Sequence, residues 1–107
     1  MIAMTMMVRD EADIVSAMIR HHLDQGVDLF LVTDNGSVDG TREILESFSR
    51  AGSIELAHDP RHLKQQHEVV TRMSREAARR GATWVLNGDA DEFWMARTPG
   101  RTIREEL

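Results

Sequence analysis

Two aspartates one residue apart, Asp89 and Asp91, follow directly on the apolar segment 82–88, and Glu92 comes next. A strand of about six residues that ends in clustered acids leaves them at the edge of a sheet. Hard divalent cations take oxygen ligands of this kind, and the rigid end of a strand would hold them in place. An acidic pair after a strand is also common as a solvated loop or a helix N-cap, so the pair alone leaves both interpretations open.

Charged side chains also stand where the other apolar segments end. They are Arg9, Asp10 and Glu11 after residues 2–8, Asp34 after residues 28–33, and His58 and Asp59 after residues 53–57. If these segments form a parallel sheet, their carboxyl ends all lie on the edge where such sheets bind ligands. We therefore expect one acidic rim, in which a bound cation would relieve the repulsion between like charges.

Two kinds of apolar segment alternate along the chain and would position these residues. Residues 2–8, 28–33, 53–57 and 82–88 are short apolar runs typical of strands, and residues 12–25, 41–52 and 63–80 carry apolar side chains at helical spacing. Gly26, Gly52 and Gly81 stand where these helices are expected to end. Because parallel strands need crossover connections, the alternation predicts a single domain over residues 1–107. The expected fold is α/β, a Rossmann-like three-layer α/β/α arrangement with a mostly parallel sheet of about four strands and right-handed crossovers.

The composition limits the classes of function. The chain has 107 residues, a formal net charge of -5 and no cysteine. An acidic chain with a pI near 5.5 lacks the basic face of a general nucleic-acid binder, and without cysteine it has no disulfides or thiolate metal sites. No apolar run reaches the roughly 18 residues of a membrane span, and Asp10 and Glu11 come too early for a secretory signal. We expect a soluble, cytoplasmic protein that recognises phosphate through a metal or through backbone groups.

Several polar side chains also have purely structural interpretations. The residues after Asp34 form a typical turn, in which Asp39 or Thr41 would cap the next helix. His21 and His22 lie within a predicted helix, where we expect one imidazole at the edge of the core and the other in solvent. An exposed basic helix face is expected from Arg72, Arg75, Arg79 and Arg80, with Glu76 among its neighbours, and most of the seven methionines are expected to fill the core.

Three motifs together carry a family resemblance. They are Val8-Arg9-Asp10-Glu11, the run Asp34-Asn35-Gly36-Ser37-Val38-Asp39-Gly40-Thr41, and Trp84 to Phe93 with its Asp89-Ala90-Asp91-Glu92-Phe93 ending. In this order and at these strand ends they resemble the nucleotide-sugar half of family 2 glycosyltransferases with the GT-A fold. Residues 19–27 add a likeness to the branch whose metal motif ends in Asp-Glu-Phe. The resemblance covers essentially the whole chain.

The resemblance implies a set of roles for these residues. Arg9, Asp10, Glu11, Asp34, Asp39 and Asp89 would bind the nucleotide, Asp34 through the base or ribose and Asp89 through the ribose or a metal-bound water. Asp91 would be the direct ligand of Mn²⁺ or Mg²⁺, and Glu92 and Trp94 would lie near the sugar. The cation would bridge the two phosphates of a nucleoside diphosphate sugar and stabilise the charge that builds on the leaving diphosphate. The acceptor, whether a glycan, a lipid or a protein, is not implied.

The chain also departs from that pattern, and two alternatives remain. Family members continue into an acceptor-binding half that supplies the catalytic base, whereas this chain stops at Leu107, so we expect a donor- and metal-binding fragment without turnover of its own. Related sequences more often carry Asn at position 10. A haloacid-dehalogenase-like phosphatase would use Asp89 as nucleophile and Asp91 as general acid, although such enzymes usually carry the pair on an early strand. A non-catalytic module would use the acidic rim, or an unpaired sheet edge, for association, including a homodimer.

Overall fold

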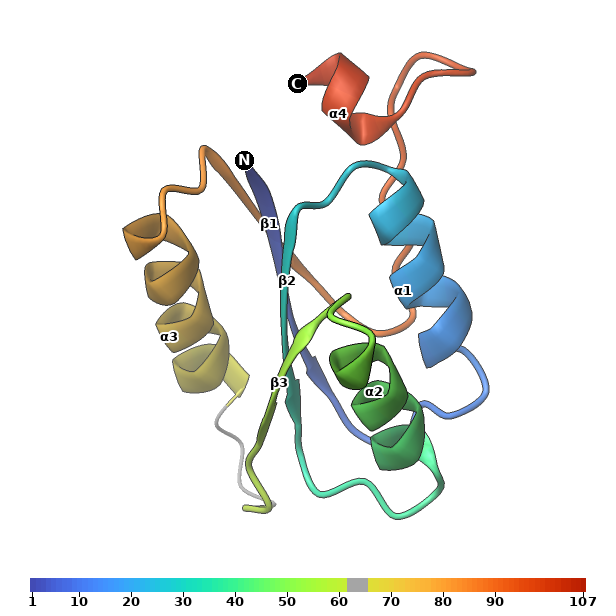
Figure 1. Cartoon of the computed structure of the whole chain (residues 1–107), viewed down its shortest axis with the longest axis vertical. Helices are drawn as coiled ribbons and strands as arrows, with labels where there is room; N and C mark the ends of the chain where they lie inside the picture. Colours follow the sequence, from blue (N-terminus) through green and yellow to red (C-terminus); the bar gives the residue numbers. More distant parts are fainter. Residues whose placement is uncertain (62–65) are drawn as a thin grey trace.

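Four parallel strands form one sheet in the order β3-β2-β1-β4. The computed structural model describes residues 1–61 and 66–107. The strands are β1 (Ile2–Val8), β2 (Leu29–Asp34), β3 (Glu55–His58) and β4 (Trp84–Gly88), and the helices are α1 (Val15–Asp24), α2 (Thr41–Arg50), α3 (Gln66–Arg79) and α4 (Ile103–Glu106). Helices α1 and α2 cover one face of the sheet and α3 covers the other (Figure 1). The predicted α/β class, with a Rossmann-like alternation and an all-parallel sheet, is confirmed.

Strand β1 lies inside the sheet because nearly every one of its side chains is apolar, which suits a strand buried on both faces. Met4 and Met6 point into the core under α1 and α2, whereas Ala3 joins Leu31 of β2 in the smaller core under α3. The two cores explain why the sequence pattern of β1 shows no alternation. Most of the methionines are core residues, as predicted, although Met95 is largely exposed.

The carboxyl ends of all four strands meet at one edge of the sheet. In the register, Asp34 of β2 lies opposite Val8 of β1 and opposite His58 of β3, and Gly88 of β4 lies opposite Met6. This edge is the lower end of the sheet in Figure 1. The predicted gathering of strand ends is therefore confirmed at the level of the backbone.

The chain beyond β4 turns back and runs alongside α1 to the opposite end of the sheet, where α4 lies (Figure 1). Helix α4 begins with a capping box between Thr102 and Glu105. The N–H of Arg104 donates to the carbonyl of Gln25, and the guanidinium of Arg104 donates to the Gly26 carbonyl and to Asp28. Because Gln25 and Gly26 directly follow α1, these bonds anchor the C-terminal segment of the chain at the C-terminal end of that helix.

The element boundaries differ from the predicted ones by a few residues. Helix α1 begins at Val15 rather than at residue 12, because the carbonyl of Glu11 closes a turn with the amides of Ile14 and Val15. Strand β3 is shifted toward His58, and the predicted helix 63–80 is described as Gln66–Arg79, with residues 63–65 of that prediction outside the described part. Within residues 1–61 and 66–107, no helix combines the length and apolar character needed to cross a membrane.

Candidate functional site

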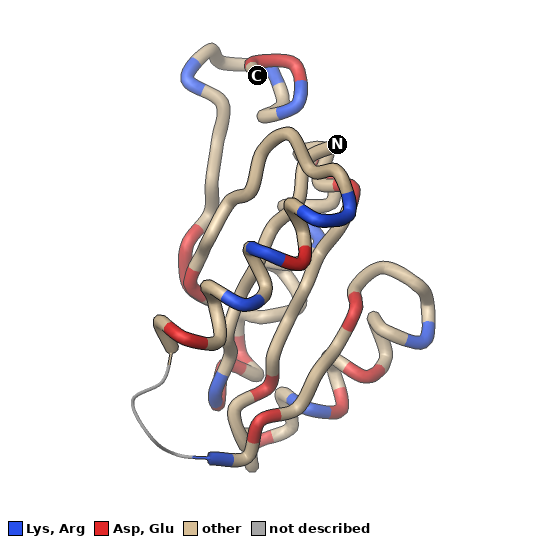
Figure 2. The backbone as a smooth tube through the Cα atoms, turned by 90° about the vertical axis from the view of Figure 1, so that its left-hand side faces the viewer, with Lys and Arg blue, Asp and Glu red and all other residues tan. Residues whose placement is uncertain are grey.

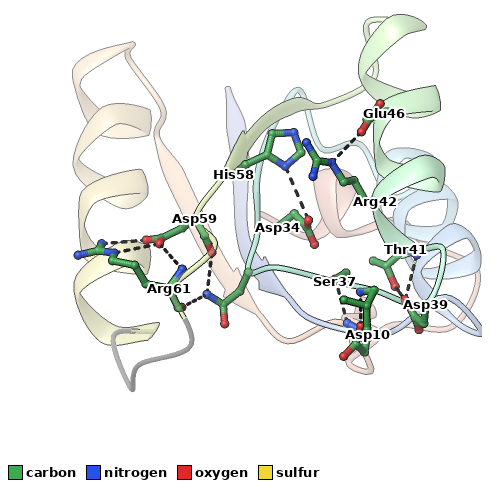
Figure 3. Close-up of polar contacts among 12 residues, drawn as sticks. Asp10, Asp34, Ser37, Asp39, Thr41, Arg42, Glu46, His58, Asp59 and Arg61 are labelled. Atoms are coloured by element: carbon green, nitrogen blue, oxygen red, sulfur yellow. Dashed lines mark hydrogen bonds and ion pairs between the residues drawn. The ribbon is translucent and has the colours of Figure 1, made fainter.

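The loops after β1 and β2 are joined by a reciprocal pair of hydrogen bonds (Figure 3). The N–H of Asp10 donates to Oγ of Ser37 over 3.0 Å, and the N–H of Val38 donates to Oδ1 of Asp10 over 2.8 Å. Asp10 has a φ of 53°, in the left-handed region that Asp and Asn tolerate better than most residues. The carboxylate of Asp10 thus holds the loop after β2, and the left-handed backbone conformation of Asp10 accompanies this bond.

Asp39 makes a second set of ties between the same loops. Its Oδ1 accepts from the N–H of Thr41 (3.0 Å) and from the Thr41 hydroxyl (2.6 Å), and its Oδ2 accepts from the N–H of Ala12 (3.2 Å). The hydroxyl of Thr41 also accepts from the N–H of Glu11 (2.8 Å). The hydrogen bonds from the Thr41 side chain and backbone hold the pKa of the Asp39 carboxyl below its ordinary value. The expectation that Asp39 or Thr41 caps the helix is wrong, because Gly40 is the N-cap of α2 without a side-chain cap, and Asp39 instead binds the amide of Thr41, the first residue of the helix.

Asp34 occupies the centre of the strand-end edge, as the last residue of β2. Its side chain is 2% exposed. Oδ2 lies 3.7 Å from Nδ1 of His58, and Oδ1 is buried without a hydrogen-bond partner among residues 1–61 and 66–107. A buried polar atom left without a partner is uncommon and costs stability. Among the predicted site residues, Asp34 is therefore the one whose side chain lacks a hydrogen-bond donor in the described part of the chain.

Asn35 is a functional neighbour that the sequence analysis did not single out. Its amide nitrogen donates to the carbonyls of Asp59 (2.9 Å) and Arg61 (2.6 Å) and so fixes the start of the loop after β3. Asp59 also pairs with the Arg61 guanidinium at 2.9 Å. The sequence indicates only an Asp-Asn-Gly turn at this point, and a turn motif does not predict which distant carbonyls the Asn side chain will contact.

The acidic turn, residues 89–92, follows β4 and is closed by its own backbone. The N–H of Asp89 donates to Oε1 of Glu92 (2.9 Å), and the N–H of Glu92 donates to the carbonyl of Asp89 (3.0 Å). Oδ1 of Asp89 accepts from the amide of Gln66 at the start of α3 (3.0 Å). Asp89, Asp91 and Glu92 are all exposed. No Arg or Lys in residues 1–61 and 66–107 pairs with Asp89 or Asp91.

The prediction of one continuous acidic cluster is wrong in its side chains. Figure 2 shows acidic positions interspersed with arginines at the strand-end edge, and a row of arginines along α3. Across the described ranges, no three His, Asp or Glu side chains come together as a metal site would require. The reason is that Asp10 and Asp39 accept hydrogen bonds within the loops that follow β1 and β2, whereas Asp89 and Asp91 lie in the turn that follows β4. The strand ends share an edge, but their carboxylates are used separately.

The donor atoms of the acidic turn nevertheless fit one kind of cation. Asp89 and Asp91 present exposed carboxylate oxygens without a cationic partner in the described part of the chain. Mg²⁺ and similar ions are commonly held by one or two carboxylates, with waters and substrate phosphates completing the coordination. The turn fits that hydrated, substrate-completed type of site and does not fit an all-protein cage.

The expectation for His21 and His22 is wrong. His22 is fully buried rather than at the core edge, and His21 is partly buried with its Nε2 bonded to the backbone of Trp94. Their partners come from residues that follow the acidic turn, so helical spacing alone could not reveal them. The basic face of α3 is as predicted, with Arg72, Arg75, Arg79 and Arg80 exposed and Glu76 paired with the last two.

Comparison with known proteins agrees with the enzyme class inferred from the motifs. The family described as glycosyltransferase family 92 matches residues 2–107. No curated protein matches the chain. The family match favours a glycosyltransferase over a phosphatase, and its number differs from that of family 2, which the motifs resemble. Because the match spans almost the whole chain, the protein belongs to glycosyltransferase family 92.

Proposed function

We propose that this glycosyltransferase domain binds a nucleoside diphosphate sugar at the carboxyl edge of its sheet, with a divalent cation at the acidic turn. The observation that carries the proposal is Oδ1 of Asp34, which is buried at the middle of that edge without a partner in the described part of the chain. An N–H or O–H group of a base or ribose would supply the missing donor. Such a ligand turns an unfavourable buried group into a recognition element.

The loops that follow β1 and β2 would shape the part of the site that binds the nucleotide. Asp10 and Asp39 hold these loops together through the bonds described above, so their contribution is to fix the backbone around the ligand. Arg9 and Glu11 follow Val8, which lies opposite Asp34 in the register, and they remain the proposed residues for the base. His58, 3.7 Å from Asp34, borders this position on the side of β3.

The acidic turn would hold Mn²⁺ or Mg²⁺, with Asp91 as the direct ligand and Asp89 as a ribose-side or water-mediated partner. When bound, such a cation stabilises the negative charge that develops on the leaving diphosphate. The Glu92 carboxylate is engaged with the Asp89 amide, so it supports the turn while Trp94 borders the sugar. The likeness of residues 89–93 to the Asp-x-Asp-Glu-Phe motif of family 2 enzymes supports the same arrangement. The acceptor and the base that activates it are not assigned.

Calorimetry tests the proposal directly. The chain is titrated with uridine, guanosine and thymidine diphosphates, each with and without Mn²⁺, and we expect one of them to bind only when Mn²⁺ is present. Asp34→Asn should weaken that binding about tenfold, because a neutral amide oxygen is a weaker hydrogen-bond acceptor than a carboxylate oxygen. The same variant should melt at an equal or higher temperature, because burying an amide with an unpartnered oxygen costs less than burying a carboxylate.

Two outcomes would count against the proposal. If none of the three nucleotides binds with Mn²⁺ present, the donor site is absent from this chain. If Asp34→Asn lowers the melting temperature and leaves affinity unchanged, Asp34 is a structural residue. Hydrolysis of a generic phosphomonoester that disappears in Asp89→Asn would instead support the phosphatase alternative.

A further inference from the structure

Two adjacent histidines of α1 bond the backbone N–H and the backbone carbonyl of one residue beyond the acidic turn, Trp94. The N–H of Trp94 donates to Nε2 of His22 over 3.0 Å, and Nε2 of His21 lies 2.7 Å from the carbonyl oxygen of Trp94. We call this pair of bonds the Trp94 clamp. It joins residues more than seventy positions apart in the chain, and it ties the segment after the acidic turn to a helix on the face of the sheet opposite α3.

The clamp requires a single chemical form of each imidazole. Nδ1 of His22 lies 2.9 Å from the carbonyl of Met18, which can only accept, so Nδ1 carries the proton. Nε2 of His22 is then the acceptor that the Trp94 amide needs, and the ring is neutral. His21 must carry a proton on Nε2 to donate to the Trp94 carbonyl. Each nitrogen that faces Trp94 is thereby matched to the backbone group in front of it.

Aromatic packing reinforces the clamp. The ring of Phe93 stacks on His22, with centroids 6.3 Å apart and planes 21° apart, and meets His21 edge-on at 5.3 Å. Phe30 of β2 contacts His22 from the core side at 6.4 Å. His22 is thus enclosed between β2 and the returning segment. It contacts the rings of His21, Phe30 and Phe93, and its two ring nitrogens bond the Met18 carbonyl and the Trp94 N–H.

The other end of the acidic turn is fixed by Gly88. A methyl group at this position would lie 2.6 Å from Cε of Met4 and 3.4 Å from Nε1 of Trp94. The indole of Trp94 therefore lies against the strand residue that immediately precedes Asp89. The turn is bracketed, since Gly88 is held in the sheet and Trp94 is held on α1.

We propose that His21 and His22 are positioning residues of the donor site, which clamp the backbone of Trp94 to α1 and thereby fix the acidic turn from outside. The consequence for ligand binding rests on the proposed function. Asp91 accepts no hydrogen bond in the described part of the chain, so its placement depends on the backbone alone. A site is more precise when its ligands are held by residues that do not use the ligating atoms.

The experiment compares two substitutions of His22. The side-chain oxygen of Gln lies near the position of Nε2, so His22→Gln keeps an acceptor for the Trp94 amide. The amide of Asn reaches only the position of Nδ1, so His22→Asn keeps the local bond to Met18 and loses the clamp. His21→Ala, at a partly buried position, removes the second bond and serves if His22→Asn does not fold.

Two measurements are made on each variant. Without ligand, NMR follows hydrogen exchange of the Trp94 amide and the chemical shifts of the amides of residues 89–92. With ligand, electron paramagnetic resonance measures free Mn²⁺ in the presence of the nucleoside diphosphate that the wild type binds. We expect His22→Asn to speed exchange at Trp94, shift the amides of the turn and weaken Mn²⁺ binding about tenfold. His22→Gln should stay close to the wild type in all three.

The outcomes separate this inference from the proposed function. If the wild type binds no Mn²⁺ with any nucleotide, the proposed function fails, and the ligand-free NMR comparison still decides whether the clamp positions the turn. If the Asn and Gln variants give equal shifts in the turn, or if they bind Mn²⁺ equally while the wild type binds it, the positioning role is overturned.

Discussion

In the two loops that follow β1 and β2, the carboxylates of Asp10 and Asp39 each accept a hydrogen bond from a backbone amide of the other loop. At the end of β4 the carboxylate of Asp91 has no such bond in the described part of the chain, and the backbone is held by His21 and His22 on α1. Both regions end strands at the same edge of the sheet (Figure 1). In the first region Asp10 and Asp39 hold the loops together, whereas in the second Glu92 helps to close the turn and Asp91 takes no part in holding it.

The difference separates acids that stabilise the fold from acids that remain available to a ligand. A carboxylate that accepts several amide hydrogen bonds is stabilised in its charged form, and the lowered pKa of Asp39 reflects this. Its lone pairs are already occupied, so it is a poor first choice for a cation. The exposed Asp91 has the opposite properties, and this is why we place the cation there.

The largest expected effect comes from comparing Asp91→Ala with Asp39→Ala. Asp91→Ala should weaken Mn²⁺-dependent nucleotide binding by about 100-fold, the upper end of the effect seen when groups around a metal are removed. Its melting temperature should not change, because the side chain is exposed. Asp39→Ala should lower the melting temperature by several degrees, because three hydrogen bonds that join two loops and start α2 are lost.

Calorimetry and thermal unfolding monitored by circular dichroism measure the two effects on the same samples. The comparison breaks if Asp39→Ala abolishes binding without lowering the melting temperature, because Asp39 would then contact the ligand itself. It also breaks if Asp91→Ala unfolds at a much lower temperature than the wild type.

The fold could be predicted from the sequence because it depends on local patterns. The continuous apolar run of residues 2–8 indicates a strand buried on both faces, and glycines at 26, 52 and 81 take the positive φ expected after a helix. Given a parallel sheet, the position of Asp34 and Asp89 at strand ends follows from topology alone. These inferences need no knowledge of which side chains meet.

The sequence could not predict which acids hold the loops and which remain exposed, because this depends on contacts between loops that are distant in the sequence. Asp10 and Asp39 are as acidic as Asp91 in the sequence, and only the facing amides of Val38 and Ala12 distinguish them. The sequence predicts one of His21 and His22 at the edge of the core, yet the partner that distinguishes His22 is the backbone of Trp94. A backbone amide leaves no signature in the sequence.

A smaller effect is expected from a pair of substitutions at Asp10. Asp10→Ala and Asp10→Gly both lose the bond to the Val38 amide, but only Gly adopts the φ of 53° without strain. Asp10→Ala should therefore be less stable than Asp10→Gly by about 1 kcal/mol, as measured by urea unfolding. Equal stabilities would mean that the loop relaxes to another conformation, and that Asp10 does not hold it as firmly as the comparison requires.

The smallest effect is a dependence of the free energy of unfolding on pH, which we expect from His22. Burial lowers the pKa of His22 from its ordinary value, with the nearby His21 acting in the same direction and the bond to Met18 opposing it. As the pH falls below about 6.5, the unfolded chain binds a proton at this residue that the folded chain does not. Stability that is fully present above this pH should then be lost toward the lower pKa of the folded state, by at most about 1.4 kcal/mol per pH unit.

Urea unfolding at pH 7.5, 6.5 and 5.5, at constant ionic strength, measures this loss. His22→Gln should flatten the profile, because Gln has no proton to gain, whereas Asp10→Gly should leave the slope unchanged. Asp28 and Asp39, whose pKa values are lowered, lose their contributions only at more acidic pH, since the ordinary pKa of Asp is about 3.9. If the slope persists in His22→Gln, another group titrates in this range. If it disappears, protonation of the one imidazole that faces the Trp94 amide accounts for the loss of stability in mild acid.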